Sequence, residues 1–231
     1  MIDALWQRWR QRYAPHTAYN RGNILKRLLR SLQPIGAPPL TVARMNHPQP
    51  RAVICTSEKI DAILKDTTPA MRLFVLLCWH TALRFSEALA VTPASFNAQD
   101  HTITIRTKGG KVRTIETPMA VYEMLQAAKA CQPDTNESCV SILNGRPLSP
   151  EGIRTAWHRL TKKAGVPELR PHDLRRTTAT NLYRATHDLR AVQQYLGHEN
   201  MASTVSYIAP LAKEELAGLH RLLNFHSQVK Q

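Results

Sequence analysis

Apolar residues recur at helical spacing at the start of this chain. Leu5, Trp6 and Trp9 form one apolar stripe, and a second stripe from Ile24 to Leu29 follows the break at Pro15. A stripe of this kind buries one face of a helix and leaves the other face in water. The pattern therefore predicts two short amphipathic helices.

Proline and glycine then interrupt the helical pattern. Five prolines and a glycine fall between Pro34 and Pro50, which is typical of a linker. Beyond the linker, polar residues precede several apolar segments, in positions where they would cap the first turn of a helix. These predicted helix starts are Thr56 or Ser57 before a helix through Leu64, Thr68-Pro69, Thr117-Pro118 and Ser149-Pro150.

One part of the chain alternates apolar and polar residues as a strand does. The segment HTITIRT is joined to VRTIET by a turn, from Lys108 to Lys111, that contains two glycines. This combination predicts an antiparallel β-hairpin. Because it is the one clear strand signal, we expect an α+β fold that is mainly α, with a small antiparallel hairpin or sheet.

Charge limits the kind of partner. The 231 residues include 31 Lys and Arg against 17 Asp and Glu, which gives a formal net charge of +14. Such an excess favours a polyanion, and nucleic acid fits best, although a generally basic surface is the simpler alternative. Aromatic residues make up only 6% of the chain, which favours gripping a duplex over stacking on single strands.

Other features argue against cross-links, metal sites and membranes. The longest apolar run, from Leu73, is interrupted by His80, and the N-terminus has no signal-peptide pattern, so we expect a cytoplasmic, nucleoid-associated protein. No cysteine pair has zinc-type spacing, so neither a disulfide framework nor a zinc site is expected. The cysteines are Cys55, Cys78, Cys131 and Cys139.

The stretch from His172 to Tyr207 holds residues that can break a phosphodiester. Tyr207 offers a nucleophile, although a phenol attacks poorly unless a base or nearby cations help to remove its proton. In HDLRR, His172 and Arg175 are three residues apart, so both lie on one helix face and could meet a single phosphate. The stretch therefore predicts a phosphoryl-transfer site.

The position of His198 follows from helix-end signals. Asp188 is a candidate N-cap for the helical pattern DLRAVQQYL, and Gly197 is a candidate C-terminal stop. His198 would then lie just past a helix end, which is a fixed loop position suited to a site residue.

These motifs resemble those of the tyrosine recombinase (phage integrase) family, in which an HxLR box, an LGH box and a downstream tyrosine recur with this spacing. TALRFSEAL and the hairpin turn are similar to two further boxes of the family, placed upstream in the family's order. The resemblance implies a tyrosine-recombinase-like catalytic domain. It also implies a catalytic set consisting of Arg84, Lys108, His172, Arg175, His198 and the nucleophile Tyr207.

The resemblance assigns a role to each residue. Arg84 and Arg175 would donate to the non-bridging oxygens, and Lys108 would protonate the departing 5′ oxygen, with Lys111 as a rival candidate. His172 would manage the tyrosine's proton, and His198 would hydrogen-bond the phosphate. Taken singly, each has a simpler interpretation: a solvated lysine, a structural histidine, a core tyrosine, or an Arg84–Glu87 ion pair. The order, spacing and chemical fit of the whole set favour catalysis.

The implied function is site-specific DNA recombination through a 3′-phosphotyrosyl intermediate, with no metal and no cofactor. The implied partners are double-stranded DNA carrying recombination sites, a homotetramer on paired sites from a protein that is monomeric in solution, and an accessory DNA-bending protein or partner recombinase. Two alternatives stay open: type IB topoisomerase-like strand relaxation, and a non-catalytic DNA-binding accessory protein of the same fold.

The domain organisation follows from the same comparison. Residues 1–50 would form a short or truncated helical DNA-clamp segment with its Pro-rich linker, and residues 51–231 the catalytic domain. Within the latter, 211–231 has an apolar stripe that predicts a C-terminal helix. This helix could pack on its own domain, but the break at Pro210 favours docking on a neighbouring protomer.

Overall fold

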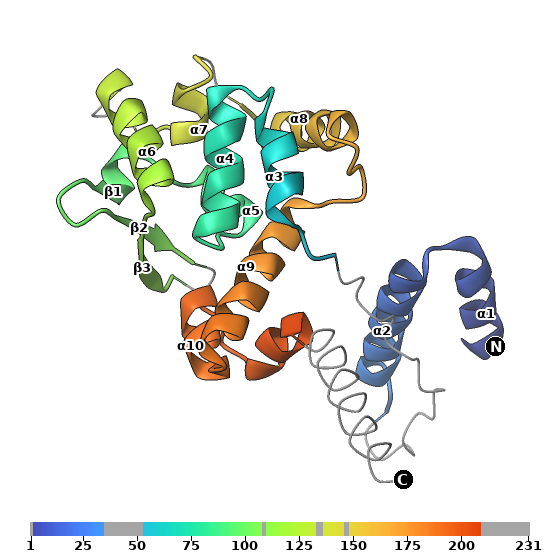
Figure 1. The fold of residues 1–231 in the computed structure, drawn as a ribbon. Coiled ribbons are helices and arrows are strands. Elements are labelled where there is room, and N and C mark those ends of the chain that lie inside the picture. The colour runs from blue at the N-terminus through green and yellow to red at the C-terminus, as the bar shows by residue number, and fades with distance from the viewer. Residues whose placement is uncertain (1, 35–52, 108–109, 133–135, 146–147, 209–231) are drawn as a thin grey trace, which may run out of the picture. The chain divides into compact units, whose positions relative to one another are not determined.

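The computed structural model describes residues 2–34, 53–107, 110–132, 136–145 and 148–208. The chain divides into two compact units, Met1–Arg51 and Ala52–Gln231. In the described part of the first unit, α1 (Ile2–Arg12) and α2 (Pro15–Ser31) confirm the predicted pair of helices (Figure 1). Pro15 begins α2, since its ring suits the first turn of a helix, so α2 starts well before the apolar stripe at Ile24.

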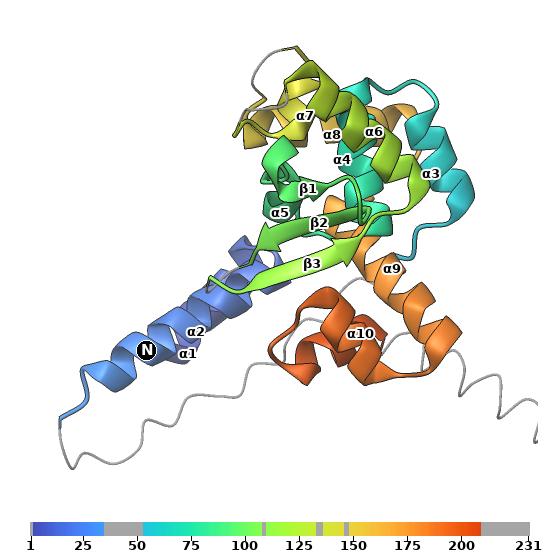
Figure 2. The same cartoon turned by 90° about the vertical axis from the view of Figure 1, so that its left-hand side faces the viewer.

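The second unit is mainly helical with one small sheet, which confirms the predicted fold class (Figures 1 and 2). Its helices are α3 (Ser57–Leu64), α4 (Pro69–His80), α5 (Phe85–Leu89), the short 3-10 helix η1 (Pro93–Ser95), α6 (Met119–Cys131), α7 (Cys139–Ile142), α8 (Pro150–Lys163), α9 (Pro171–Thr186) and α10 (Leu189–Leu196). The backbone is also helical over 201–208. No helix in the described ranges is long and apolar enough to cross a membrane.

The centre of this unit is α4, whose residues Leu73, Phe74 and Leu77 are fully buried. Figure 1 shows α4 between α6 and α7 on one side and α3 and α8 on the other. Its apolar run is therefore a core helix. A second, smaller core cluster joins Ala82 to α9, α10 and the 201–208 helix, in which Ile208 is 4% exposed.

The sheet is antiparallel and has three strands in the order β1-β2-β3. The predicted hairpin is confirmed as β2 (Thr102–Arg106) paired with β3 (Val112–Glu116), while β1 (Phe96–Asn97) is an addition that the sequence pattern did not predict. Lys108 and Gly109, at the turn, lie outside the described residues. The linker and the predicted C-terminal helix are likewise outside them.

Three of the four predicted helix starts hold, and one is wrong. Helix α3 begins at Ser57 after the N-cap Thr56, and the hydroxyls of Thr68 and Ser149 accept hydrogen bonds from the first turns of α4 and α8. Thr117 does not cap α6. Its hydroxyl donates to the carbonyl of His101 at 2.7 Å, which ties the end of β3 to β2, and Pro118 takes the N-cap position instead.

Candidate functional site

The side chain of Tyr207 lies between two of the predicted histidines. Its hydroxyl is 2.7 Å from Nε2 of His172, across 35 residues of sequence. The rings of His172 and His198 both meet the tyrosine ring edge to face, with ring centroids 5.4 and 5.3 Å away. The guanidinium carbon of Arg176 lies 5.3 Å from the centre of the same ring. Helix α9 thus brings a base and a cation to the tyrosine.

The two histidines are held in the neutral form. Burial lowers the pKa of His172, and the charges of Arg175 and Arg176 lower it further. A neutral ring with its proton on Nδ1 can accept the hydrogen bond of the Tyr207 hydroxyl at Nε2. His172 therefore has both the position and the neutral form that it needs to act as a base for that proton.

His198 is turned the other way by its own partner. Its Nδ1 lies 2.9 Å from the hydroxyl of Thr204, in the helix that carries Tyr207. Burial, followed by the nearby charges of Arg175, Arg84 and Arg113, lowers the pKa of His198 to about 4. When Nδ1 accepts from Thr204, the proton lies on Nε2, which makes that nitrogen a hydrogen-bond donor.

This low pKa predicts a pH dependence of stability. A histidine that binds a proton less readily in the folded state contributes stability above its unfolded pKa of 6.5, and this contribution is lost as the pH falls towards about 4. We expect His198→Gln to weaken the loss of stability between about pH 7.5 and about pH 5, measured as the urea midpoint. His158→Gln, at an exposed position of α8, is the matched control. A wild-type pH dependence in His198→Gln would contradict this prediction.

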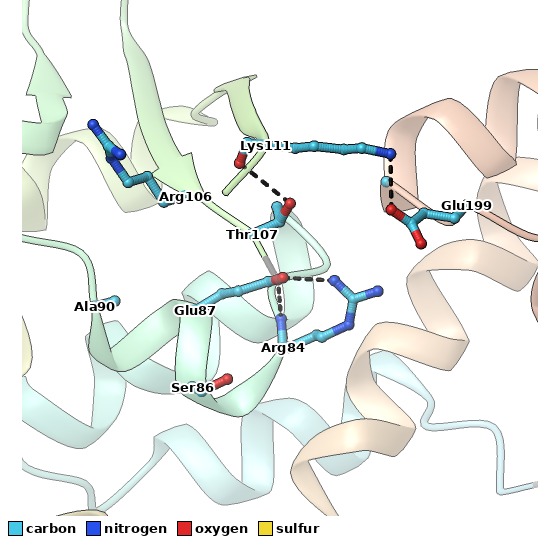
Figure 3. A pocket seen from close by; sticks show the side chains of 9 residues that line it. Arg84, Ser86, Glu87, Ala90, Arg106, Thr107, Lys111 and Glu199 are labelled. Carbon is cyan, nitrogen blue, oxygen red and sulfur yellow. Dashed lines mark hydrogen bonds and ion pairs between the residues drawn. The ribbon is translucent and has the colours of Figure 1, made fainter. Parts of the chain in front are cut away.

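Arg84 lies at the N-cap of α5 and is paired with Glu87. Its Nη1 lies 2.6 Å from one carboxylate oxygen of Glu87, and its backbone N–H donates to the other at 2.8 Å (Figure 3). The pair anticipated as a structural alternative is therefore present. The Arg84 side chain is still 37% exposed, so its other N–H groups remain accessible to an anion.

Arg175 is the most deeply buried member of the set. Its side chain has no exposed surface, and its terminal nitrogens donate to the carbonyls of Ala82 and, at 2.6 Å, Leu196. Its Nη1 also lies 3.6 Å from the carboxylate of Glu87. Burial and the charge of Arg84 lower the pKa of Arg175 to about 10, so it stays charged at neutral pH. Its Nε has no hydrogen-bond partner among the described residues.

A pocket of about 790 Å³ lies beside Arg84 and Glu87 (Figure 3). Lys111 reaches across it from the end of the hairpin turn, and its ammonium lies 2.8 Å from the carboxylate of Glu199. Both side chains are about two-thirds exposed, so the pair contributes only about 0–1 kcal/mol. Lys111 thus has a protein partner, while Lys108, the residue preferred by resemblance, lies outside the described residues.

Sequence reasoning missed Arg113, on β3. Its Nη1 donates to the carbonyl of Tyr195 at 2.5 Å, and its Nη2 lies 3.8 Å from the carboxylate of Glu87. The alternation of the strand could have indicated its position, because Arg113 lies two residues before buried Ile115 and therefore shares the inward face of β3 with it. Within the described ranges, no group of three or more His, Cys, Asp or Glu side chains could hold a metal ion.

The structure thus brings five of the six predicted residues together, from four separate elements. The model of the Phage integrase family matches residues 54–214, which include all six positions. This match covers more than half of the chain. The protein belongs to the phage integrase family.

Curated relatives are tyrosine recombinases. XerC of Staphylococcus aureus (strain MSSA476) is 29% identical over 187 residues, which cover 75% of this chain and 61% of that protein. XerC of Lactobacillus delbrueckii subsp. bulgaricus (strain ATCC BAA-365 / Lb-18) is 34% identical over 152 residues, or 62% of this chain and 51% of that protein. The chain spans between about half and three fifths of the length of these relatives.

Solved structures share the fold. The Tn1549 transposon integrase, in complex with transposon right end DNA, superposes with a TM-score of 0.69 at 19% identity, covering 94% of this chain and 84% of that chain. XerA recombinase superposes with a TM-score of 0.61 at 25% identity, covering 91% and 78%. The first of these likenesses concerns the fold alone.

Proposed function

We propose that this protein is a site-specific DNA recombinase that cleaves and rejoins DNA through a 3′-phosphotyrosyl intermediate. The observation that carries the proposal is the 2.7 Å contact between the Tyr207 hydroxyl and Nε2 of a neutral His172. A tyrosine paired with a base and surrounded by cations is an activated nucleophile. The excess of positive charge over the chain suits a duplex partner.

The proposed first step exchanges one phosphate ester for another. The Tyr207 oxygen forms a bond to phosphorus as its proton passes to His172, and the bond from phosphorus to the 5′ oxygen breaks. Lys108 supplies the proton that the departing 5′ oxygen needs. Because the new bond is also a phosphodiester, a 5′-hydroxyl from a partner strand can reverse the step and reseal the DNA without an energy source.

The remaining residues are assigned to the charge that builds on the phosphate. Arg84 is exposed enough to donate directly, and Nε2 of His198 is a donor when its Nδ1 accepts from the hydroxyl of Thr204. Arg175 stays charged, but its side chain has no exposed surface and two of its five N–H groups donate to carbonyls, so its positive charge is what it contributes in this arrangement. Fixed donors of this kind stabilise a transition state without having to reorganise.

The wider assembly is also part of the proposal. Residues 1–50 would serve as a short DNA-clamp segment and linker, and residues 51–231 as the catalytic domain. Strand exchange between two duplexes requires four such sites, so we propose a tetramer on paired recombination sites that forms from monomers, with an accessory DNA-bending protein or a partner recombinase. Its place of action would be the cytoplasm, on the nucleoid.

Covalent trapping tests the proposed function. The wild-type protein would be incubated with a pool of nicked suicide duplexes, in which the fragment beyond the cut diffuses away and prevents religation. We expect an adduct that resists denaturation, with the protein on the 3′ phosphate and a free 5′-hydroxyl. An adduct on a 5′ phosphate, or no adduct across the pool, would contradict the proposal. Strand exchange without supercoil relaxation would separate a recombinase from a topoisomerase.

A further inference from the structure

Arg113 occupies a position where a charged side chain is unexpected. In the register of the sheet it stands opposite Ile105, and it shares the inward face of β3 with Ile115, both of which are buried. Its side chain is 12% exposed. A buried guanidinium is costly unless partners meet it, so the contacts of Arg113 show what this position does.

Those contacts converge on the residues just before His198. Nη1 of Arg113 donates to the carbonyl of Tyr195 at 2.5 Å. The same side chain lies against Gly197, since a Cβ built there would come within 3.3 Å of both Cδ and Nη1. Gly197 has a φ of 61°, which turns the chain out of α10. Arg113 therefore packs on the turn that leads into His198.

The end of α10 needs such support. The last carbonyls of a helix lack partners within the helix and carry partial negative charge. Arg113 takes the carbonyl of Tyr195, and Arg175 takes the next one, of Leu196. The amide side chain of Gln193 then donates to the carbonyl of His198 at 3.0 Å. Two guanidinium groups thus fix consecutive carbonyls directly ahead of the turn.

The hairpin has a second contact with this region, and it is weaker. Lys111 pairs with Glu199, but both side chains are largely exposed, and such pairs contribute little. The Arg113 contact is largely buried. The same side chain brings Nη2 within 3.8 Å of Glu87, whose carboxylate also pairs with Arg84 and Arg175. Arg113 therefore links the hairpin to both halves of the site.

We propose that Arg113 is a positioning residue, which holds the α10–Gly197 turn so that His198 is correctly placed, and which couples the hairpin to that placement. The inference rests on the proposed function only where it is tested by measuring DNA cleavage. The placement of His198 itself can be measured in the free protein. Arg113 touches no reacting atom in this assignment and acts through the carbonyl of Tyr195 and through Glu87.

The first test follows the His198 ring in the absence of DNA. In Arg113→Met, NMR titration is expected to show a changed His198 chemical shift and a raised pKa, because a buried positive charge near the ring is lost. Arg72→Met is the matched control, since Arg72 also donates to a backbone carbonyl, that of Leu64, but on α4. A His198 titration in Arg113→Met that matches the wild type would overturn the inference.

The second test measures cleavage in single turnovers on a suicide duplex. We expect Arg113→Met to cleave about 10- to 100-fold more slowly, with duplex affinity changed less than about threefold, because misplacement affects the reaction more than binding. Arg113→Lys should recover part of the rate, since it keeps the charge and one hydrogen bond. A rate within about twofold of the wild type would contradict the inference.

Folding is checked in the same variants. If Arg113→Met does not fold, Arg113→Lys replaces it. The lysine keeps the positive charge but cannot reproduce the guanidinium's contacts with the carbonyl of Tyr195 and with Gly197, so a changed His198 chemical shift in this variant reports placement of the ring and not loss of charge. An unaltered His198 shift in Arg113→Lys would overturn the inference. Failure of the wild type to cleave any duplex would instead contradict the proposed function, while the titrations would still decide the role of Arg113.

Discussion

Tyr207→Phe is expected to abolish covalent attachment to DNA while leaving duplex binding close to that of the wild type. The substitution removes one oxygen, the atom that would form the bond to phosphorus, and leaves the ring in its contacts with His172 and His198. The phosphate-binding groups and the fold stay in place. Denaturing gels of suicide-duplex reactions would measure the adduct, and gel shifts of an intact duplex would measure binding.

Tyr183→Phe is the matched control for this prediction. Tyr183 is a partly buried tyrosine on α9 that packs on the same small core cluster as Tyr207, and its ring lies beside His187 rather than beside the predicted site. It should form the adduct at the wild-type rate. An adduct that persists in Tyr207→Phe would remove Tyr207 as the nucleophile, and loss of duplex binding in that variant would point to a role in the fold.

Local signals predicted the framework of the site well. Asp188 accepts hydrogen bonds from Arg190 and Ala191, and Gly197 ends α10 in the left-handed conformation, as the cap pattern predicted. These features depend on a few neighbouring residues, so the sequence contains them directly. The same holds for the β2–β3 hairpin. Thr117 is the exception, because its hydroxyl donates to the carbonyl of His101, just before β2, and capping preferences do not include such a contact.

The residue patterns of the sequence could not predict contacts between elements that are distant along the chain. Spacing placed His172 and Arg175 on one face of α9, but it could not tell that Arg175 would be fully buried against the carbonyls of Ala82 and Leu196. The carbonyl of Ala82 is presented by a backbone φ of 51°, which is rare outside glycine. Packing between elements selected these partners, and the role of Arg113 arises in the same way.

The shared carboxylate of Glu87 gives these distant contacts a common physical basis. It lies 2.6, 3.6 and 3.8 Å from guanidinium nitrogens of Arg84, Arg175 and Arg113. Although burial opposes ionisation, hydrogen bonds from Arg84 and the charges of Arg84 and Arg175 lower the pKa of Glu87. One fixed negative charge thus holds three cations near each other, and leaves a net positive field for a phosphate.

Lys108→Ala is expected to slow cleavage by about 10²- to 10⁴-fold, the usual contribution of a general acid, with little change in duplex binding. The alcohol that departs from phosphorus is a poor leaving group unless a proton reaches its oxygen. Lys111→Ala is the matched control in the same turn. It removes an exposed ion pair with Glu199, so we expect a change of only a few fold.

A substrate with sulfur in place of the bridging 5′ oxygen tests whether Lys108 acts as the general acid or in some other way. A thiolate leaves without protonation, since thiols ionise near pH 8.5, far below alcohols. The wild type and Lys108→Ala should therefore cleave the sulfur-substituted duplex at similar rates, although they differ greatly on the ordinary one. A defect in Lys108→Ala that persists with sulfur would assign this lysine to phosphate binding. A defect that appears only in Lys111→Ala, and that sulfur removes, would assign the proton to Lys111.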